Sequence, residues 1–232
     1  MSEETIEKVV ADAFTRVQEA YARREDAERR STLLIFPVHH VQHNRKLYVR
    51  MCEQELRFAF VEAFNDAFRG TNLSYSVETP TIDRYLFSVS NTSTAHGLND
   101  QLPCISPYGE PGFFDLVIYE GRDIACLIEF KARNPVTDKY AKDLLKLSNP
   151  IEDGKEGTGS PLRYFIQMVE SYDHLTIQSI KGKLKELSEQ SKYTQGKKPV
   201  RCICYSLGKR HSGEQQGKRI IDLTFPLRRF SA

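Results

Sequence analysis

Two apolar runs of the sequence are interrupted by charged residues that could do chemistry together. Asp115 lies in the run 113–119, whereas Glu129 and Lys131 lie in the run 124–132. The runs predict two neighbouring strands joined by a short turn, and an unpaired charge is costly to bury in such strands. The three charged side chains therefore need partners, which each other or the surrounding elements must supply.

Strand geometry decides whether these three side chains can meet. Residues two apart in a strand point to the same face, so Glu129 and Lys131 share a face. Asp115 joins them if it lies opposite Glu129, which a three-residue turn at 121–123 would allow. A two-residue turn would place Asp115 on the other face, unless a β-bulge restores the register.

A metal ion would explain the three charges together. Two close carboxylates repel each other unless one is protonated or a cation lies between them. Mg²⁺ typically takes one or two carboxylates, with water and phosphate as further ligands. Lys131 beside such an ion could orient a water or help to deprotonate it. The alternative is a buried ion pair between Lys131 and one carboxylate, which would leave the other carboxylate unexplained.

Glu53 is a third candidate acid. Helical periodicity predicts a helix over 44–69, closed by Gly70, in which Glu53 projects between Leu56 and Phe64 on the apolar stripe. It would either bind the metal or pair with Arg57 or Arg50. The predicted buried face consists of Leu56, Phe60, Ala63, Phe64 and Ala67, and the predicted solvated acids are Glu55, Glu62 and Asp66.

The element order over residues 44–170 resembles the core of the PD-(D/E)XK nuclease superfamily: the helix with Glu53, a strand, the strand with Asp115, the strand with Glu129-Phe130-Lys131, a helix and a strand. The resemblance implies that Asp115 and Glu129 bind Mg²⁺, for which Mn²⁺ could substitute. It also implies that Lys131 serves the attacking water and that the backbone carbonyl of Phe130 is a further ligand. The motif proline departs from the pattern, because the nearest one, Pro111, is not adjacent to Asp115.

The fold expected from these patterns is one α/β domain over 1–232. It has a restriction-endonuclease-like α-β-β-β-α-β core at about 44–170, with a mixed sheet flanked by helices. An N-terminal helical extension (1–43) precedes the core, and a basic C-terminal part (171–232) with further strands follows it. The predicted helices outside 44–69 are 4–21, 137–147 and 174–187. The predicted strands are 73–79, the two charged runs, 163–170, 199–207 and 219–227. Residues 80–112 are predicted to form a long loop excursion.

The net charge of +2 conceals a basic segment at 181–219, where eleven Lys and Arg face three Asp and Glu. Such an excess suits phosphate contacts with nucleic acid, although a solvated helix and loop would explain it equally well. The candidate nucleic-acid-binding residues are Lys183, Lys185, Lys197, Lys198, Arg201, Lys209 and Arg210.

Other features bound the class of protein. The five cysteines are an odd number and most lie in apolar segments, which favours reduced core residues, and Cys202-Ile-Cys204 fits a strand better than a zinc site. No apolar run is long enough for a membrane span, and the acidic start does not resemble a signal peptide, so a cytoplasmic protein is expected. The 4–21 helix could serve a homodimer.

The expected function is a Mg²⁺-dependent endonuclease that hydrolyses phosphodiester bonds of DNA and leaves a 5′-phosphate and a 3′-hydroxyl. Two alternatives remain open. One is a catalytically inactive module of the same fold that binds nucleic acid or a protein partner. The other is a nuclease of this fold that acts on RNA, because fold does not determine substrate.

Overall fold

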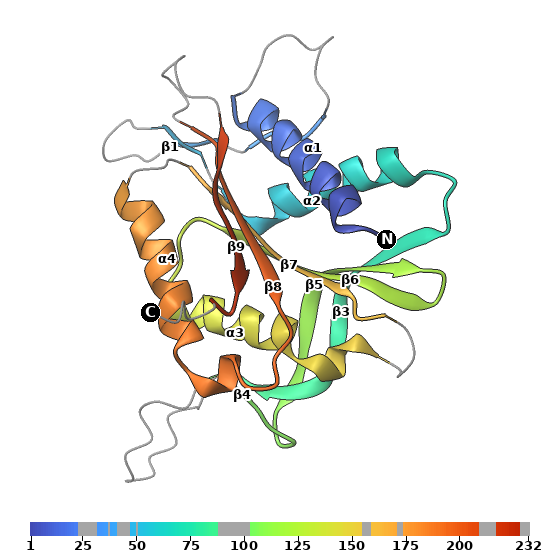
Figure 1. Ribbon diagram of the computed structural model, residues 1–232. Helices are drawn as coiled ribbons and strands as arrows, with labels where there is room; N and C mark the ends of the chain where they lie inside the picture. The colour runs from blue at the N-terminus through green and yellow to red at the C-terminus, as the bar shows by residue number, and fades with distance from the viewer. Residues whose placement is uncertain are drawn as a thin grey trace.

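A mixed seven-stranded sheet lies between two pairs of helices in the computed structural model (Figure 1). The structure describes residues 1–22, 32–36, 38–40, 47–49, 51–87, 103–154, 159–170, 174–208 and 217–227. The fold is therefore α/β, as predicted. The α-helices of this part of the chain are α1 (Glu3–Ala22), α2 (Glu53–Phe68), α3 (Thr137–Ser148) and α4 (His174–Ser188), and the 3₁₀ helices are η2 (Pro150–Asp153) and η3 (Ser191–Tyr193).

The sheet has the strand order β4-β3-β5-β6-β7-β8-β9. Strands β3, β5 and β6 form an antiparallel meander, β7 and β8 run parallel to β6, and β9 is antiparallel to β8. A separate pair is formed by β1 (Val38–His40) and β2 (Leu47–Val49). The sheet strands are β3 (Leu73–Leu86), β4 (Cys104–Ile105), β5 (Glu110–Glu120), β6 (Asp123–Ala132), β7 (Leu162–Val169), β8 (Val200–Ser206) and β9 (Lys218–Phe225).

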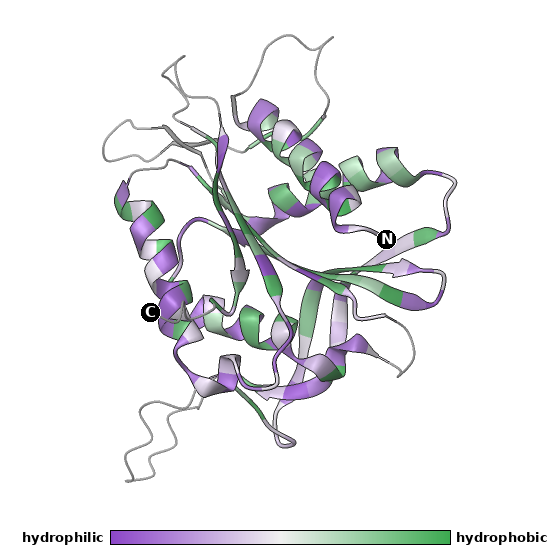
Figure 2. Ribbon diagram, in the orientation of Figure 1, coloured by the Kyte–Doolittle hydropathy of each residue, from purple (hydrophilic) through white to green (hydrophobic). Residues whose placement is uncertain are grey.

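Each face of the sheet carries its own apolar core, because successive strand residues point to opposite sides. Helices α1 and α2 cover one face, where Ile118 and Ile128 are buried. Helices α3 and α4 cover the other, where Val117 and Leu127 are buried. Figure 2 shows the helices banded in green and purple, as expected for helices with one apolar side.

Helix α1 matches its prediction in extent. The apolar residues that recur at helical spacing along it are buried against α2 and the sheet, so they are not available for the homodimer that the sequence raised. These buried apolar side chains are Ile6, Val9, Val10, Ala13, Phe14, Val17, Ala20 and Tyr21.

The predicted helix over 44–69 begins later than expected, at Glu53. Residues 47–49 pair with β1 instead, and Glu55 caps the start of α2 by accepting the backbone N–H of Cys52 at 2.9 Å. Glu55 is therefore buried, and its prediction as a solvated acid is wrong. Ala67 is exposed, contrary to prediction, whereas Leu56, Phe60, Ala63 and Phe64 are buried as expected.

The hairpin of β5 and β6 has the predicted register, but it reaches it through a two-residue turn and a β-bulge. The turn has two residues, Gly121 and Arg122, and not the expected three. A bulge at Ala125 follows: Tyr119 pairs with Ile124, but Ile118 pairs with Cys126. From there Leu116 lies opposite Ile128, so Asp115 and Glu129 oppose each other.

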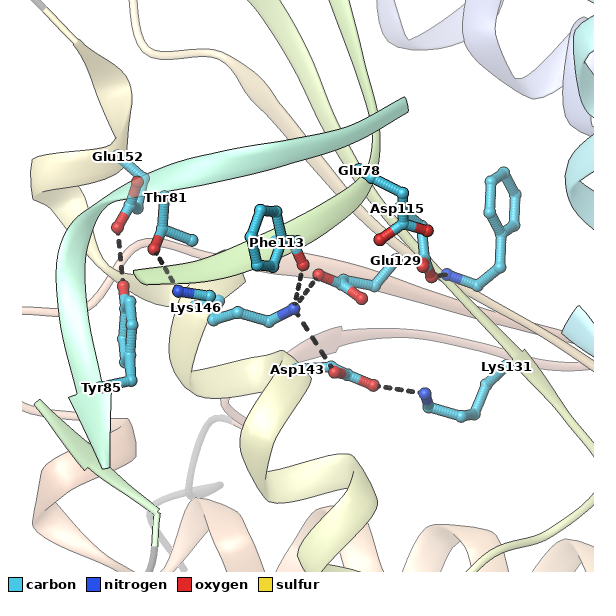
Figure 3. A network of polar contacts seen from close by, with 12 residues as sticks. Glu78, Thr81, Tyr85, Phe113, Asp115, Glu129, Lys131, Asp143, Lys146 and Glu152 are labelled. Atoms are coloured by element: carbon cyan, nitrogen blue, oxygen red, sulfur yellow. Dashed lines mark hydrogen bonds and ion pairs between the residues drawn. The ribbon is translucent and has the colours of Figure 1, made fainter. Parts of the chain in front are cut away.

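Strand β3 is longer than the predicted 73–79 and reaches Leu86. Its register against β5 shifts between Pro80 and Arg84, and the strand curves sharply (Figure 3). The buried carboxylate of Glu152, in η2, accepts the backbone N–H groups of Ile82 at 2.7 Å and Asp83 at 3.1 Å, and the hydroxyl of Tyr85 at 2.7 Å. This carboxylate satisfies donors that the curved strand cannot pair with a neighbouring strand.

The remaining elements agree with prediction to within a few residues. Strands β7, β8 and β9 and helices α3 and α4 all lie where the sequence placed them. Val136 is the N-cap of α3. Cys126, Cys202 and Cys204 are free and buried, as expected for reduced core residues.

Replacing Glu152 should destabilise the fold. In Glu152→Gln the amide nitrogen must face a hydrogen-bond donor, so at least one buried group of β3 loses its acceptor, at a cost of about 1–3 kcal/mol. Urea unfolding measures this cost. Glu186→Gln, at an exposed position on α4, is the matched control and should leave the midpoint unchanged. Equal midpoints for both variants would contradict the anchoring role of Glu152.

Candidate active site

A pocket of about 620 Å³ opens where β3, β5, β6 and α3 meet. It brings together Asp115, Glu129, Lys131 and Glu53, the four residues whose side chains the sequence nominated. Carboxylates outnumber ammonium groups in its lining, which favours a cationic ligand. The lining acids are Glu53, Glu78, Glu110, Asp115, Glu129 and Asp143, and the lining lysines are Lys131, Lys142 and Lys146.

Both Asp115 and Glu129 have raised pKa values, and the charge of Asp115 contributes to the rise at Glu129. The carboxylate of Asp115 accepts the backbone N–H of Phe130 through Oδ2 at 2.7 Å (Figure 3). Burial raises the pKa of Asp115, and the charge of Asp143 raises it further. Burial also raises the pKa of Glu129 well above its usual value; Lys146 opposes this rise, and the charges of Asp143 and Asp115 add to it. The predicted crowding of like charges is therefore present.

Lys146 of α3 was missed by the sequence reasoning and holds the centre of the site. Its ammonium pairs with Oε1 of Glu129, donates to the backbone carbonyl of Phe113 at 2.6 Å and lies 3.6 Å from Oδ1 of Asp143. The Lys146 and Glu129 side chains are 2% and 3% exposed. A lysine this buried needs such partners, because the charge has lost its water.

A sequence signal for this contribution of α3 existed. Tyr140, Leu144 and Leu147 recur at helical spacing and mark the apolar face of this helix. Asp143 is three residues after Tyr140 and four before Leu147, so it lies on that face, and Lys146 follows Asp143 at i+3. The same criterion that drew attention to Glu53, a charge on an apolar stripe, would have found Asp143, and the i, i+3 spacing would then have pointed to Lys146.

Lys131 is held by two acids, neither of them Asp115 or Glu129. Its ammonium lies 2.7 Å from Oδ2 of Asp143 and 3.0 Å from Oε1 of Glu53. Burial alone would lower the pKa of Lys131, but the charges of Asp143 and Glu53 outweigh it and raise the pKa above its usual value. Lys131 is therefore an ammonium at neutral pH.

Glu53 reaches the site from an unexpected position. It is the first residue of α2 and its side chain is 42% exposed, so it is not buried in the core as its place on the apolar stripe implied. Its partner is Lys131. Arg57, one of the two predicted partners, pairs with Glu78 instead, and Arg50 lies outside the described residues.

Glu78 adds backbone strain to the site. Its φ of 50° is in the left-handed region, which non-glycine residues seldom adopt. It lies on β3 next to Asp115 (Figure 3). Arg57 pairs with Glu78 and lies 4.0 Å from Oδ1 of Asp115. Strain of this kind costs of order 1–3 kcal/mol and concentrates at functional sites.

The donor set fits a magnesium ion with few protein ligands. Within the described residues, no group of three or more His, Cys, Asp or Glu side chains is arranged to hold a metal ion. Mg²⁺ makes a smaller demand, because one or two carboxylates suffice when water and phosphate complete the shell. The Lys146 ammonium donates to Oε1 of Glu129, and the backbone N–H of Phe130 donates to Oδ2 of Asp115. Oε2 of Glu129 and Oδ1 of Asp115 do not accept these two hydrogen bonds. The Phe130 carbonyl ligand stays a prediction.

The predicted basic residues do not gather at the pocket. Lys183 donates to Asn134 at 2.6 Å, Lys198 lies 3.4 Å from Asp153, and Arg201 pairs with Asp222 at 2.7 Å. Among the candidates that the structure describes (Lys183, Lys185, Lys197, Lys198 and Arg201), none lines the pocket, and Lys209 and Arg210 lie outside the described residues.

Comparisons with protein-family models, with curated proteins and with solved structures gave no match to this chain. The site must therefore be interpreted from its own geometry. In the part of the chain that the structure describes, no helix has the length and apolar character needed to cross a membrane.

Removing the buried ammonium should destabilise the protein through Glu129. In Lys146→Met the Glu129 carboxylate loses its buried counter-charge, which typically costs about 3–5 kcal/mol. In the double variant Lys146→Met/Glu129→Gln no carboxylate remains at position 129. Its loss of unfolding free energy should therefore be smaller than the sum of the losses of the two single variants, by more than about 1 kcal/mol. Thermal or urea unfolding of the four proteins in this cycle measures the coupling.

Lys142→Met, on the same helix but partly exposed, is the control for the cycle. It should change the free energy of unfolding by no more than about 0.5 kcal/mol. Additive losses for Lys146 and Glu129 would contradict an energetically important pair.

Proposed function

We propose that the protein is a Mg²⁺-dependent nuclease that hydrolyses phosphodiester bonds of DNA, acting as an endonuclease. One observation carries the proposal: Asp115 and Glu129 oppose each other in neighbouring strands and line one pocket with Lys131. The order α2, β3, β5, β6, α3, β7 supports a restriction-endonuclease-like core, although the short β4 is added between β3 and β5.

Asp115 and Glu129 would hold Mg²⁺, with Glu53 at its edge and the Phe130 carbonyl as a further ligand. The ion would neutralise charge on the scissile phosphate and activate a water. A cation between the two carboxylates would offset the burial that chiefly raises their pKa values and the repulsion from neighbouring acids that adds to this rise.

Lys131 would act as a hydrogen-bond donor and not as a base. Its raised pKa keeps it protonated, so it can orient the attacking water or stabilise negative charge on the phosphate, but it has no lone pair with which to take a proton. Asp143 and Glu53 fix the position of its ammonium. Hydrolysis in which water attacks phosphorus in line and the 3′ oxygen leaves would give a 5′-phosphate and a 3′-hydroxyl.

A second candidate function is favoured by the Lys146–Glu129 pair. A lysine that already neutralises Glu129 does electrostatically part of what a metal would do. A module of the same fold that binds nucleic acid without cleaving it would keep such a pair. Cleavage with Mg²⁺ separates this candidate from the nuclease.

Cleavage should depend on the metal and on the nominated residues. Supercoiled plasmid and single-stranded DNA, each incubated with Mg²⁺, Mn²⁺ or EDTA, should be cut in the first two conditions only. Asp115→Asn, Glu129→Gln and Lys131→Ala should each lower the rate by about 100-fold or more, as is typical when one essential catalytic group is lost. Glu53→Gln should lower it less and recover at high Mg²⁺.

Asp123→Asn is the matched control for these acids, since Asp123 begins β6 at an exposed position away from the pocket. It should cut at the wild-type rate. Cleavage that persists in EDTA, or in Asp115→Asn, would overturn the proposed site. A wild-type protein that binds DNA but does not cut it with either metal would favour the binding module.

The basic segment gives a separate prediction about DNA binding. If Lys185, Lys197 and Lys198 contact phosphates, charge reversal should weaken binding and flatten its dependence on salt by about 0.9 in logarithmic slope per lost contact. Fluorescence anisotropy between 50 and 200 mM salt, roughly the range over which such slopes are resolved, measures this. Lys8→Glu, on the exposed side of α1, is the control. An unchanged slope would mean that these lysines form a solvated face.

A further inference from the structure

Aromatic residues, which we call the aromatic wall, are among those that line the acidic pocket, and the proposed hydrolysis does not use them. Tyr108 is 92% exposed and Phe113 is 51% exposed, and both line the pocket together with Phe87. Large aromatic residues usually bury most of their surface, so exposed rings beside a candidate active site require an explanation.

The turn that carries Tyr108 is fixed in place. Arg84 donates through Nε to the carbonyl of Gly109 at 2.7 Å, and Ser106 N–H donates to the carbonyl of Arg84 at 3.0 Å. Gly109 packs so closely on β3 that an added Cβ would lie 2.4 Å from the backbone of Tyr85. The exposed ring therefore projects from a rigid backbone, which reduces the entropy lost when a ligand binds.

We propose that this wall binds an unpaired nucleobase, so that the substrate of the site is single-stranded DNA or an unpaired stretch of DNA. This inference rests on the nucleic-acid substrate of the proposed function. A ring can stack only on the face of a base. Bases inside a duplex offer their edges to a protein and hide their faces, whereas an unpaired base exposes its face.

The positions of the cations agree with this substrate. The ammonium of Lys142 lies 4.4 Å from the centre of the Phe87 ring, and Lys142 and Phe87 both line the pocket. A base on the aromatic wall would thus have an ammonium nearby for its phosphate. The volume of about 620 Å³ is within the range of pockets that hold one small ligand, roughly 300–1,000 Å³.

A fluorescence experiment tests binding without any need for cleavage. The chain has no tryptophan, so Tyr108→Trp contains a single indole. With Ca²⁺ in place of Mg²⁺, titration with a single-stranded oligonucleotide should quench the indole, because a stacked base lies against it. A blunt hairpin duplex of the same sequence should quench it at least about fivefold less well at equal concentration, because it lacks the stacked base, whose contribution to the binding free energy is about 1 kcal/mol or more. Equal quenching by the two DNAs, or no quenching by the single strand, overturns the inference.

A second experiment measures the effect of Tyr108 on cleavage. Tyr108→Ala should lower kcat/KM on the single strand by roughly 5- to 140-fold, corresponding to about 1–3 kcal/mol for one stacked base. Tyr108→Phe keeps the ring and should retain wild-type activity. Phe58→Ala is the matched control, because Phe58 is 57% exposed on α2 and does not line the pocket. A Tyr108→Ala protein that cuts the single strand at the wild-type rate overturns the inference.

The two readouts separate failure of the inference from failure of the proposed function. A protein that cuts no DNA, but whose Tyr108→Trp variant is quenched selectively by the single strand, loses the nuclease assignment and keeps the base-binding wall. A protein that cuts duplex DNA at the same rate with and without the Tyr108 ring keeps the nuclease assignment and loses the wall.

Discussion

The buried ammonium of Lys146 is the constraint on which the rest of the site depends. An unpaired ammonium cannot remain charged in a dry core, so three elements must supply acceptors: Glu129 from β6, the Phe113 carbonyl from β5 and Asp143 from α3 itself. Satisfying this one group therefore fixes α3 against the β5–β6 hairpin. It also fixes Asp143, whose second oxygen then faces Lys131.

From that point the charges alternate across the pocket. Glu129, Lys146, Asp143, Lys131 and Glu53 form a continuous series of opposite neighbours that reaches α2 on the other side of the sheet. Asp115 lies beside this series and pairs with a backbone N–H. The series contains three acids and two lysines, so adding Asp115 leaves an excess of negative charge. That excess would favour a divalent cation in the pocket. Repulsion from neighbouring acids adds to the burial that raises the pKa values of Asp115 and Glu129.

The sequence predicted the elements and the residue faces that follow from periodicity, but it did not predict features that depend on one specific contact. Period-two alternation placed Glu129 and Lys131 on one face, and apolar residues at i, i+3, i+4 spacing indicated α1 and its buried apolar residues. The start of α2 was missed because it is set by one hydrogen bond, in which the backbone N–H of the N-cap residue Cys52 donates to the Glu55 carboxylate. Periodicity does not report such a contact. Glu53 consequently entered the site from the first turn and not from the apolar stripe. Lys146 was missed because Glu129 and the Phe113 carbonyl, two of its three partners, are distant in sequence, although its i, i+3 spacing from Asp143 was visible.

Backbone irregularities make the site possible, and none of them could be located from composition. With a two-residue turn, regular pairing would have put Asp115 opposite Ile128 and directed its carboxylate away from Glu129. The bulge at Ala125 adds one residue to β6 and reverses that outcome. The register shift of β3 between Pro80 and Arg84 then curves the strand over the pocket, and Glu78, with its positive φ, lies next to Asp115. Three departures from regular strand geometry thus surround one pair of carboxylates, which is where a sequence is expected to sacrifice local regularity for the placement of functional groups.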